Sequence, residues 1–306
     1  MPPACACCPR SPPALATDPA TVRRPRATPY WLCLPALLLY GVMLATPLAM
    51  TALLSFNSYS DTEGVLLTWG LHNYTEVLSD GYFHTIFLRT LRIALATTVI
   101  CTLIGVPEAW IISRLSPRWR GLCLLVVLGP LLISVVVRTL GWTILMGRNG
   151  LINQGLQALH LSGTPVELLF TETGIIIALV HVMVPFMVLA VWTALQGVDP
   201  AGENAAISLG ASDAVVFFRI VLPQVMQGVL SGSLIVFSLS ASAFATPALI
   251  GGRRLKVAAT AIYDEFLATL NWPLGAAIAC LLVASVMAIM LLWNRIVERR
   301  TQGATA

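Results

Sequence analysis

Charged residues are scarce in this chain of 306 residues. Asp, Glu, Lys and Arg together make up 10% of it, whereas a soluble globular chain carries about 25%. Hydrophobic residues make up 57%, and the mean hydropathy is +0.83. So little charge in such an apolar chain excludes an ordinary soluble domain and indicates an integral membrane protein.

Lysine is almost absent, and so are the usual catalytic motifs. The single lysine, Lys256, lacks the glycine pattern that precedes the lysine of a phosphate-binding P-loop. No His-Glu-x-x-His motif occurs, the four histidines are scattered, and no serine, histidine and aspartate order suggests a nucleophile elbow. We therefore expect no catalytic residue, metal site or cofactor in this chain, and an intramembrane hydrolase is a poor interpretation.

Cysteine is absent from the expected outer loops, so no disulfide framework is implied. Three cysteines, Cys5, Cys7 and Cys8, lie in an N-terminal stretch rich in Pro and Ala. They indicate either metal binding or lipid attachment, or an incidental tail. We expect residues 1–29 to be a disordered cytosolic tail, 30–295 a six-helix transmembrane domain and 296–306 a cytosolic C-terminal tail.

Long apolar runs dominate the rest of the chain. Six of them reach or exceed the roughly 20 residues that cross a bilayer as a helix. They cover residues 31–56, 91–112, 122–146, 174–195, 229–250 and 273–293. Because backbone groups in lipid must be satisfied internally, these runs predict an all-α integral membrane fold with six transmembrane helices.

The distribution of Arg and Lys predicts the orientation. With the N-terminus in the cytosol, the inner segments hold eleven cations and the outer loops four, namely Arg148, Arg253, Arg254 and Lys256. Arg89 and Arg92 lie at the outer mouth of the second span. Cytosolic loops carry an excess of such residues, so we expect both termini in the cytosol. The outer loops also hold eight of the 14 acids, which is faint support for a cationic solute.

One inner connection, residues 197–223, is long and polar. Asp199 and Pro200 form a helix start, and Gly210 is suited to end that helix in the left-handed conformation. Ser212 and Asp213 start a second helix, and Pro223 is expected to break or kink the entry into the fifth span. Such a hairpin either docks a cytosolic partner or lies on the inner headgroups.

The hairpin resembles the cytosolic loop of membrane subunits of binding-protein-dependent ABC importers. That family's pattern is Glu-Ala-Ala, three residues, Gly, nine residues, Ile, one residue, Leu-Pro. The matching residues are Ala205, Ala206, Gly210, Ile220, Leu222 and Pro223. Asn204 stands at the position of the family's Glu, and Glu203 precedes it. The resemblance implies that the hairpin is the coupling helix, which sits in a groove of an ATPase.

The likeness covers nearly the whole chain after the tail. Residues 138–154, 243–252 and 271–275 are similar to segments of polyamine-type permeases, most of all the first permease subunit of spermidine/putrescine systems. The resemblance implies the type I ABC importer architecture. It also implies a second permease subunit, two copies of an ABC ATPase that bind ATP and Mg, and an extracytoplasmic solute-binding protein. Permeases for thiamine, iron or aminoethylphosphonate share much of this pattern.

Polar residues in or near the spans are the candidates for a substrate path. Arg138 lies within the third span, where its charge indicates either a functional site or a pairing with a helix carbonyl or the second permease. Tyr263, Asp264, Glu265 and Trp272 are candidates for an outer gate. An ion-coupled secondary transporter would need paired intramembrane carboxylates, and only Glu108 lies near a span. A membrane scaffold is a further alternative, although it does not explain the hairpin.

Overall fold

The computed structural model describes residues 28–60, 62–160 and 164–304. The tail at residues 1–27, with Cys5, Cys7 and Cys8, lies outside the described residues. The chain divides into two compact units, Met1–Ala49 and Met50–Ala306. Helix α1 (Thr28–Leu54) begins in the first unit, contains Pro35 and Pro47, and is apolar enough to span a membrane over Leu34–Leu54.

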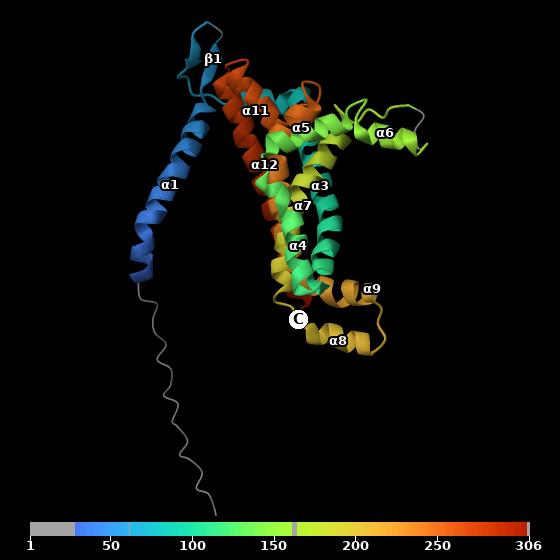
Figure 1. Ribbon diagram of the computed structural model, residues 1–306. Helices are drawn as coiled ribbons and strands as arrows, with labels where there is room; N and C mark the ends of the chain where they lie inside the picture. Colours follow the sequence, from blue (N-terminus) through green and yellow to red (C-terminus); the bar gives the residue numbers. More distant parts are fainter. Residues whose placement is uncertain (1–27, 61, 161–163, 305–306) are drawn as a thin grey trace, which may run out of the picture. The chain divides into compact units, whose positions relative to one another are not determined.

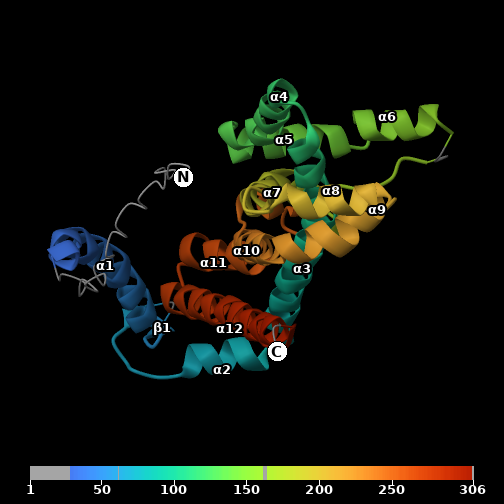
Figure 2. The same cartoon turned by 90° about the horizontal axis from the view of Figure 1, so that it is seen from below.

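The second unit contains four more long apolar helices. They are α3 (Gly81–Arg114), α7 (Glu172–Leu195), the continuous helical segment that ends with α10 (Leu222–Ala241), and α12 (Trp272–Ala304). α3, α7 and α10 pack closely against one another around the main apolar core, and α12 contacts α10 and α11 (Ala258–Leu267) (Figures 1 and 2). Among the described residues, five single helices are therefore long enough to span a membrane, which confirms most of the predicted spans.

The expected third span is not one straight helix. α4 (Pro117–Leu128) and the 3₁₀ turn η1 (Gly129–Leu132) are followed by α5 (Val135–Met146) and α6 (Leu151–Ala158), with a bend of 96° between the two halves. Pro130 has no backbone N–H to continue the helix. Its carbonyl accepts the Ile133 N–H at 3.3 Å and a second hydrogen bond from the Arg138 guanidinium, so the backbone at the break is satisfied within the chain.

The other spans differ from the predicted limits at their outer ends. α3 begins at Gly81, ten residues before the predicted start, because Asp80 caps it and Glu172 pairs with both Arg89 and Arg92. α10 ends at Ala241, well before the predicted end at residue 250. Ser242 there bonds back to the Ser238 carbonyl at 2.9 Å, and the π-helical turn η3 (Pro247–Gly251) follows.

A small folded piece precedes α3. Strands β1 (Ser58–Ser60) and β2 (Gly64–Leu66) form an antiparallel pair that the apolar runs did not predict, and α2 (His72–Ser79) follows. The buried Asn73 amide donates to the carbonyls of Ser55 and Asn57 at 2.9 and 2.7 Å. These two bonds hold residues 55–57 against the start of α2.

Two glycines allow α10 to approach α7 closely. A Cβ at Gly228 would lie 2.5 Å from the Ala194 Cβ, and one at Gly232 would lie 2.8 Å from the Met187 Sδ. Small residues four apart are a common basis of helix association in membranes, because dispersion contacts replace the hydrophobic effect there.

We expect Gly228→Val to destabilise the protein by about 1–3 kcal/mol, because the added methyls would push α10 away from α7. The apparent melting temperature in detergent should fall by several degrees. Gly155→Val is the matched control, since a Cβ there has no neighbour within 4 Å. Equal melting temperatures for the two variants would contradict the close-contact explanation.

Candidate functional site

The predicted hairpin begins with α8 (Pro200–Ser208), and its ends follow the sequence signals. The Asp199 carboxylate accepts the Ala201 N–H at 2.9 Å. At the other end Gly210 has a φ of +84°, its N–H donates to the Ile207 carbonyl at 2.9 Å, and the Ala211 N–H donates to the Ala206 carbonyl at 3.0 Å. These two bonds form a Schellman motif, which requires a left-handed residue where Gly210 stands. The predicted start and end of this helix are confirmed.

The second helix of the hairpin continues directly into the fifth span. α9 (Asp213–Val216) leads into the π-helical turn η2 (Phe217–Val221) and then into α10. Of the two outcomes expected at Pro223, a break or a kink, the break does not occur, because Asp213–Ala241 is helical throughout. Pro223 lies in the first turn of α10, where a missing N–H costs little, and the π-helical turn precedes it.

One side of α8 packs against the rest of this chain, and the other side is exposed to solvent. Ala206 is half-buried against the main core, and the Glu203 side chain is 19% exposed. The exposed residues form what we call the open face of α8, namely Asn204, Ala205, Ile207, Ser208 and Leu209. Leu209 is 89% exposed. Ala205 and Ala206 therefore lie on different sides of α8, since neighbouring residues are about 100° apart around a helix.

The residues that match the family pattern divide between the two sides. Asn204, Ala205, Gly210 and Pro223 are exposed, whereas Ala206, Ile220 and Leu222 are half-buried. A Cβ at Gly202 would lie 3.9 Å from the Ile220 Cγ2, so α8 packs against the π-helical turn. Ala206, Ile220 and Leu222 thus belong to the packed side of the hairpin, and Asn204, Ala205 and Gly210 belong to its exposed side.

A single guanidinium connects the hairpin to α3. Arg114, the last residue of α3, donates to the Glu203 carboxylate at 2.6 Å and to that of Asp213 at 3.4 Å. It also lies over the Trp110 ring, 4.4 Å from the centroid, and that ring contacts Phe217 at 4.8 Å. Arg114 therefore joins both helices of the hairpin to a membrane span. Sequence reasoning counted Arg114 only as an inner cation, because no local pattern signals a pairing across 89 residues.

Two ionisable side chains of the spans, Arg138 and His181, form hydrogen bonds within the chain. Arg138 is buried and donates to the Pro130 carbonyl, which is the structural pairing considered from the sequence. His181 accepts a hydrogen bond from the Trp142 indole at 3.3 Å. Glu108 lines an apolar pocket of about 630 Å³ between α3 and α4. These groups do not converge on one site, since Glu108 lines a different part of the bundle.

The four residues considered for an outer gate do not form one cluster. Tyr263 and Asp264 line one pocket of about 170 Å³, and Asp264 pairs with the Lys256 ammonium at 2.8 Å. This hydrogen bond raises the pKa of Lys256 above its ordinary value, so the ammonium stays charged at physiological pH. Glu265 instead accepts from Thr269 at 2.6 Å, and the Trp272 indole donates to the Phe266 carbonyl at 3.1 Å. Only Tyr263 and Asp264 are therefore placed together.

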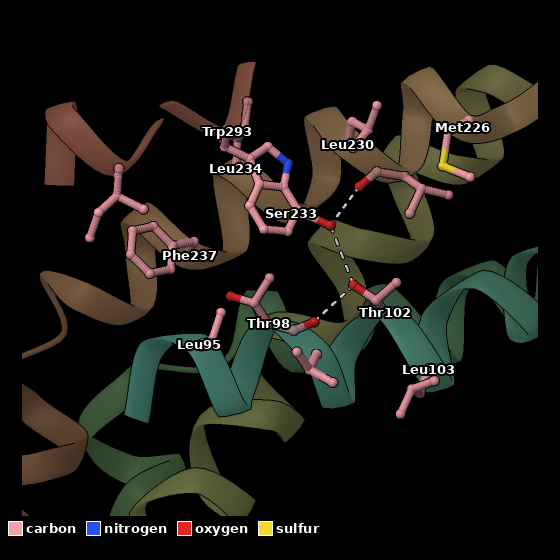
Figure 3. A pocket seen from close by; sticks show the side chains of 13 residues that line it. Leu95, Thr98, Thr102, Leu103, Met226, Leu230, Ser233, Leu234, Phe237 and Trp293 are labelled. Carbon is pink, nitrogen blue, oxygen red and sulfur yellow. Dashed lines mark hydrogen bonds between the residues drawn. The ribbon is translucent and has the colours of Figure 1, made fainter. Parts of the chain in front are cut away.

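A largely apolar pocket of about 300 Å³ lies between α3, α10 and α12 (Figure 3). Its polar lining consists of three hydroxyl groups. Thr102 and Ser233 lie 3.3 Å apart, and Thr98 and Thr102 each bond to the preceding turn of α3. The hydropathy pattern did not single these residues out, because Thr and Ser are ordinary in apolar helices. No carboxylate is among the described residues that line it, so the pocket offers no counter-charge to a cation.

The family model for the inner membrane component of binding-protein-dependent transport systems matches residues 89–303. The chain belongs to this family. It is a multi-pass inner-membrane permease subunit of an ABC importer, and therefore a transport subunit rather than an enzyme.

Named relatives agree with this assignment. The permease is 33% identical over 238 residues to the spermidine/putrescine transport system permease protein PotB of Escherichia coli, covering 78% of this chain and 86% of that protein. It is 29% identical over 270 residues to the molybdenum transport system permease protein ModB of Mycobacterium bovis, covering 88% and 94%.

A solved structure shares the fold. A bacterial alginate ABC transporter, in complex with its alginate pentasaccharide-bound periplasmic protein, aligns with a TM-score of 0.72 at 19% identity. The alignment covers 90% of this permease and 95% of that chain. The type I importer architecture expected from the sequence is therefore confirmed.

Proposed function

We propose that this permease subunit passes a polyamine of the spermidine/putrescine class into the cytosol. The observation that carries the substrate class is the 33% identity to PotB over most of both chains. A second candidate is a related importer for another small solute. The similarity to ModB favours it, because that alignment covers a larger share of this chain.

ATP binding and hydrolysis, with Mg, take place in this proposal on two copies of a partner ATPase. The open face of α8 supports docking there, because it combines small side chains with two exposed apolar ones, Ile207 and Leu209. Small side chains let a helix backbone approach a partner closely. The docking residues of the proposal are those of the family pattern together with its preceding acid: Glu203, Asn204, Ala205, Ala206, Gly210, Ile220, Leu222 and Pro223.

The remaining partners in this proposal are a second permease subunit, which is a different chain, and an extracytoplasmic solute-binding protein. Both termini face the cytosol in this arrangement, as the excess of arginine in the inner segments supports. The hairpin then lies on the cytosolic side. The ends of α3 and α7 near Arg89 and Glu172 lie on the outer side.

Reconstitution of the complete importer in liposomes tests the proposal. Spermidine-loaded or putrescine-loaded binding protein should stimulate ATP hydrolysis and drive uptake of labelled polyamine. The matched control replaces the ATPase with a variant that binds but cannot hydrolyse ATP. Stimulation only by another solute would show that the substrate is not a polyamine. Failure of an ATPase to co-purify would contradict the proposed role of the hairpin in coupling to that ATPase.

A further inference from the structure

A basic pocket of about 220 Å³ lies at the end of the molecule opposite the hairpin. The start of α3 supplies Tyr82, Thr85, Ile86 and Arg89, and the loop after η3 supplies Arg253, Arg254 and Lys256. Four of these seven residues are cations. No carboxylate is among the described residues that line the pocket.

Nearby acids neutralise only part of this charge. Glu172 pairs with Arg89 and Arg92, at 3.3 and 3.4 Å, and Asp264 pairs with Lys256. Arg253 forms no ion pair with any described residue. A third acid, Asp80, lies beside the pocket and accepts the Tyr82 N–H at 2.8 Å. Three acids therefore face five cations in this region, so a surplus of two positive charges remains.

The loop that carries these cations has a fixed shape. Gly252 has a φ of +55°, and a Cβ there would lie 2.9 Å from the Phe170 ring. The Arg254 guanidinium lies 5.9 Å from the centroid of the same ring, and Arg89 donates to the Lys256 carbonyl at 3.0 Å. The loop is therefore held against α3 and the start of α7, and its cations are positioned before any partner arrives.

Three cations within four residues are unexpected in an outer loop, because outer segments of membrane proteins are depleted in Arg and Lys. The membrane orientation of the chain therefore does not explain why these three cations are present. A polyamine does not explain them either, since a cation is repelled by a pocket with a positive surplus. An anionic group that arrives from outside fits both the charge and the location.

We propose that this pocket is a docking seat for acidic side chains of the extracytoplasmic solute-binding protein. The inference rests on the proposed function, because it requires this end to face outward. The planar guanidinium of arginine can form two parallel hydrogen bonds to one carboxylate. Water occupies about 30 Å³ per molecule, so a pocket of this size admits a carboxylate side chain in place of several waters.

The test measures binding of the loaded binding protein to the complete importer in nanodiscs of neutral lipid, over a range of salt concentrations. We expect the double variant Arg253→Glu, Arg254→Glu to weaken binding about tenfold or more, mainly through slower association, and to flatten the salt dependence. Arg253→Gln, Arg254→Gln should give a smaller effect in the same direction. Arg148→Glu is the matched control, because Arg148 is an exposed outer cation that does not line this pocket.

Retention of the partner ATPase on gel filtration identifies the variants that are folded. Unchanged affinity in the folded double variant would overturn the proposal, and so would an equal loss in Arg148→Glu. An effect that occurs only in nanodiscs with anionic lipid would assign the pocket to a lipid headgroup instead. If the unaltered importer binds no solute-binding protein, the proposed function fails, which is a different result from loss in the variants alone.

Discussion

Replacement of Ala205 by tryptophan is expected to abolish transport and to release the ATPase, while the permease still inserts and folds. Ala205 lies on the open face of α8 and is exposed, so the indole has room within this chain. The same ring would hold the helix away from a partner groove. We expect a loss of about 2 kcal/mol or more, which corresponds to about thirtyfold in affinity.

Co-purification of the ATPase and uptake into liposomes are the measurements. Ala158→Trp is the matched control, since it adds the same ring at an exposed alanine in α6. Ala206→Trp would not separate docking from folding, because Ala206 packs against the chain's own core. If Ala205→Trp transports as well as Ala158→Trp, the open face does not dock the ATPase.

Arg114→Ala is expected to reduce the number of solute molecules transported per ATP hydrolysed. The variant leaves the Glu203 carboxylate, which is 19% exposed, without its cation, at a cost of about 1–3 kcal/mol. It also removes the group that lies over Trp110. The open face of α8 is unchanged, so ATPase binding should persist while movement of the hairpin is transmitted poorly to α3.

The controls separate the two contacts of this guanidinium. Asp213→Asn should have little effect, because the Asp213 side chain is 78% exposed and such pairs contribute little. Arg114→Lys keeps the positive charge but loses the planar guanidinium that can bond to two carboxylates at once. It should give an intermediate number of solute molecules transported per ATP. The exchange Arg114→Glu, Glu203→Arg should recover part of the ratio. A normal ratio in Arg114→Ala would show that the bridge does not transmit the movement.

Local chemistry explains which parts of this molecule were predictable from the sequence. Asp199, Pro200 and Gly210 act through backbone groups one to four residues away, so the limits of α8 could be predicted without knowledge of the fold. Long apolar runs likewise predicted the membrane spans. The limits of the spans were less predictable, because hydropathy places the end of a span where a charged residue appears. At Arg89 a distant acid, Glu172, pairs with that charge, and the helix continues beyond it.

Long-range contacts were not predictable in the same way. The bridge from Arg114 to Glu203 joins two segments that only the folded bundle brings together. At the bend between η1 and α5, the Arg138 side chain donates to the Pro130 carbonyl, a contact between two turns that hydropathy does not register. The pair Gly228 and Gly232 had a readable spacing, yet the partner helix and its Met187 could be identified only from the packed structure.

The glycine contact between α10 and α7 has a mechanical consequence. Without Cβ atoms at Gly228 and Gly232, the two helices lie so close that we expect rotation of one helix alone to bring its atoms into collision with the other. Gly105 of α3 fits against Met187 in the same manner, since a Cβ there would lie 2.9 Å from the Met187 Cγ. The hairpin is continuous with α10, and Arg114 joins it to α3. We therefore expect a displacement of α8 to move α10 and the closely packed α7 together, and to reach α3 through the Arg114 bridge.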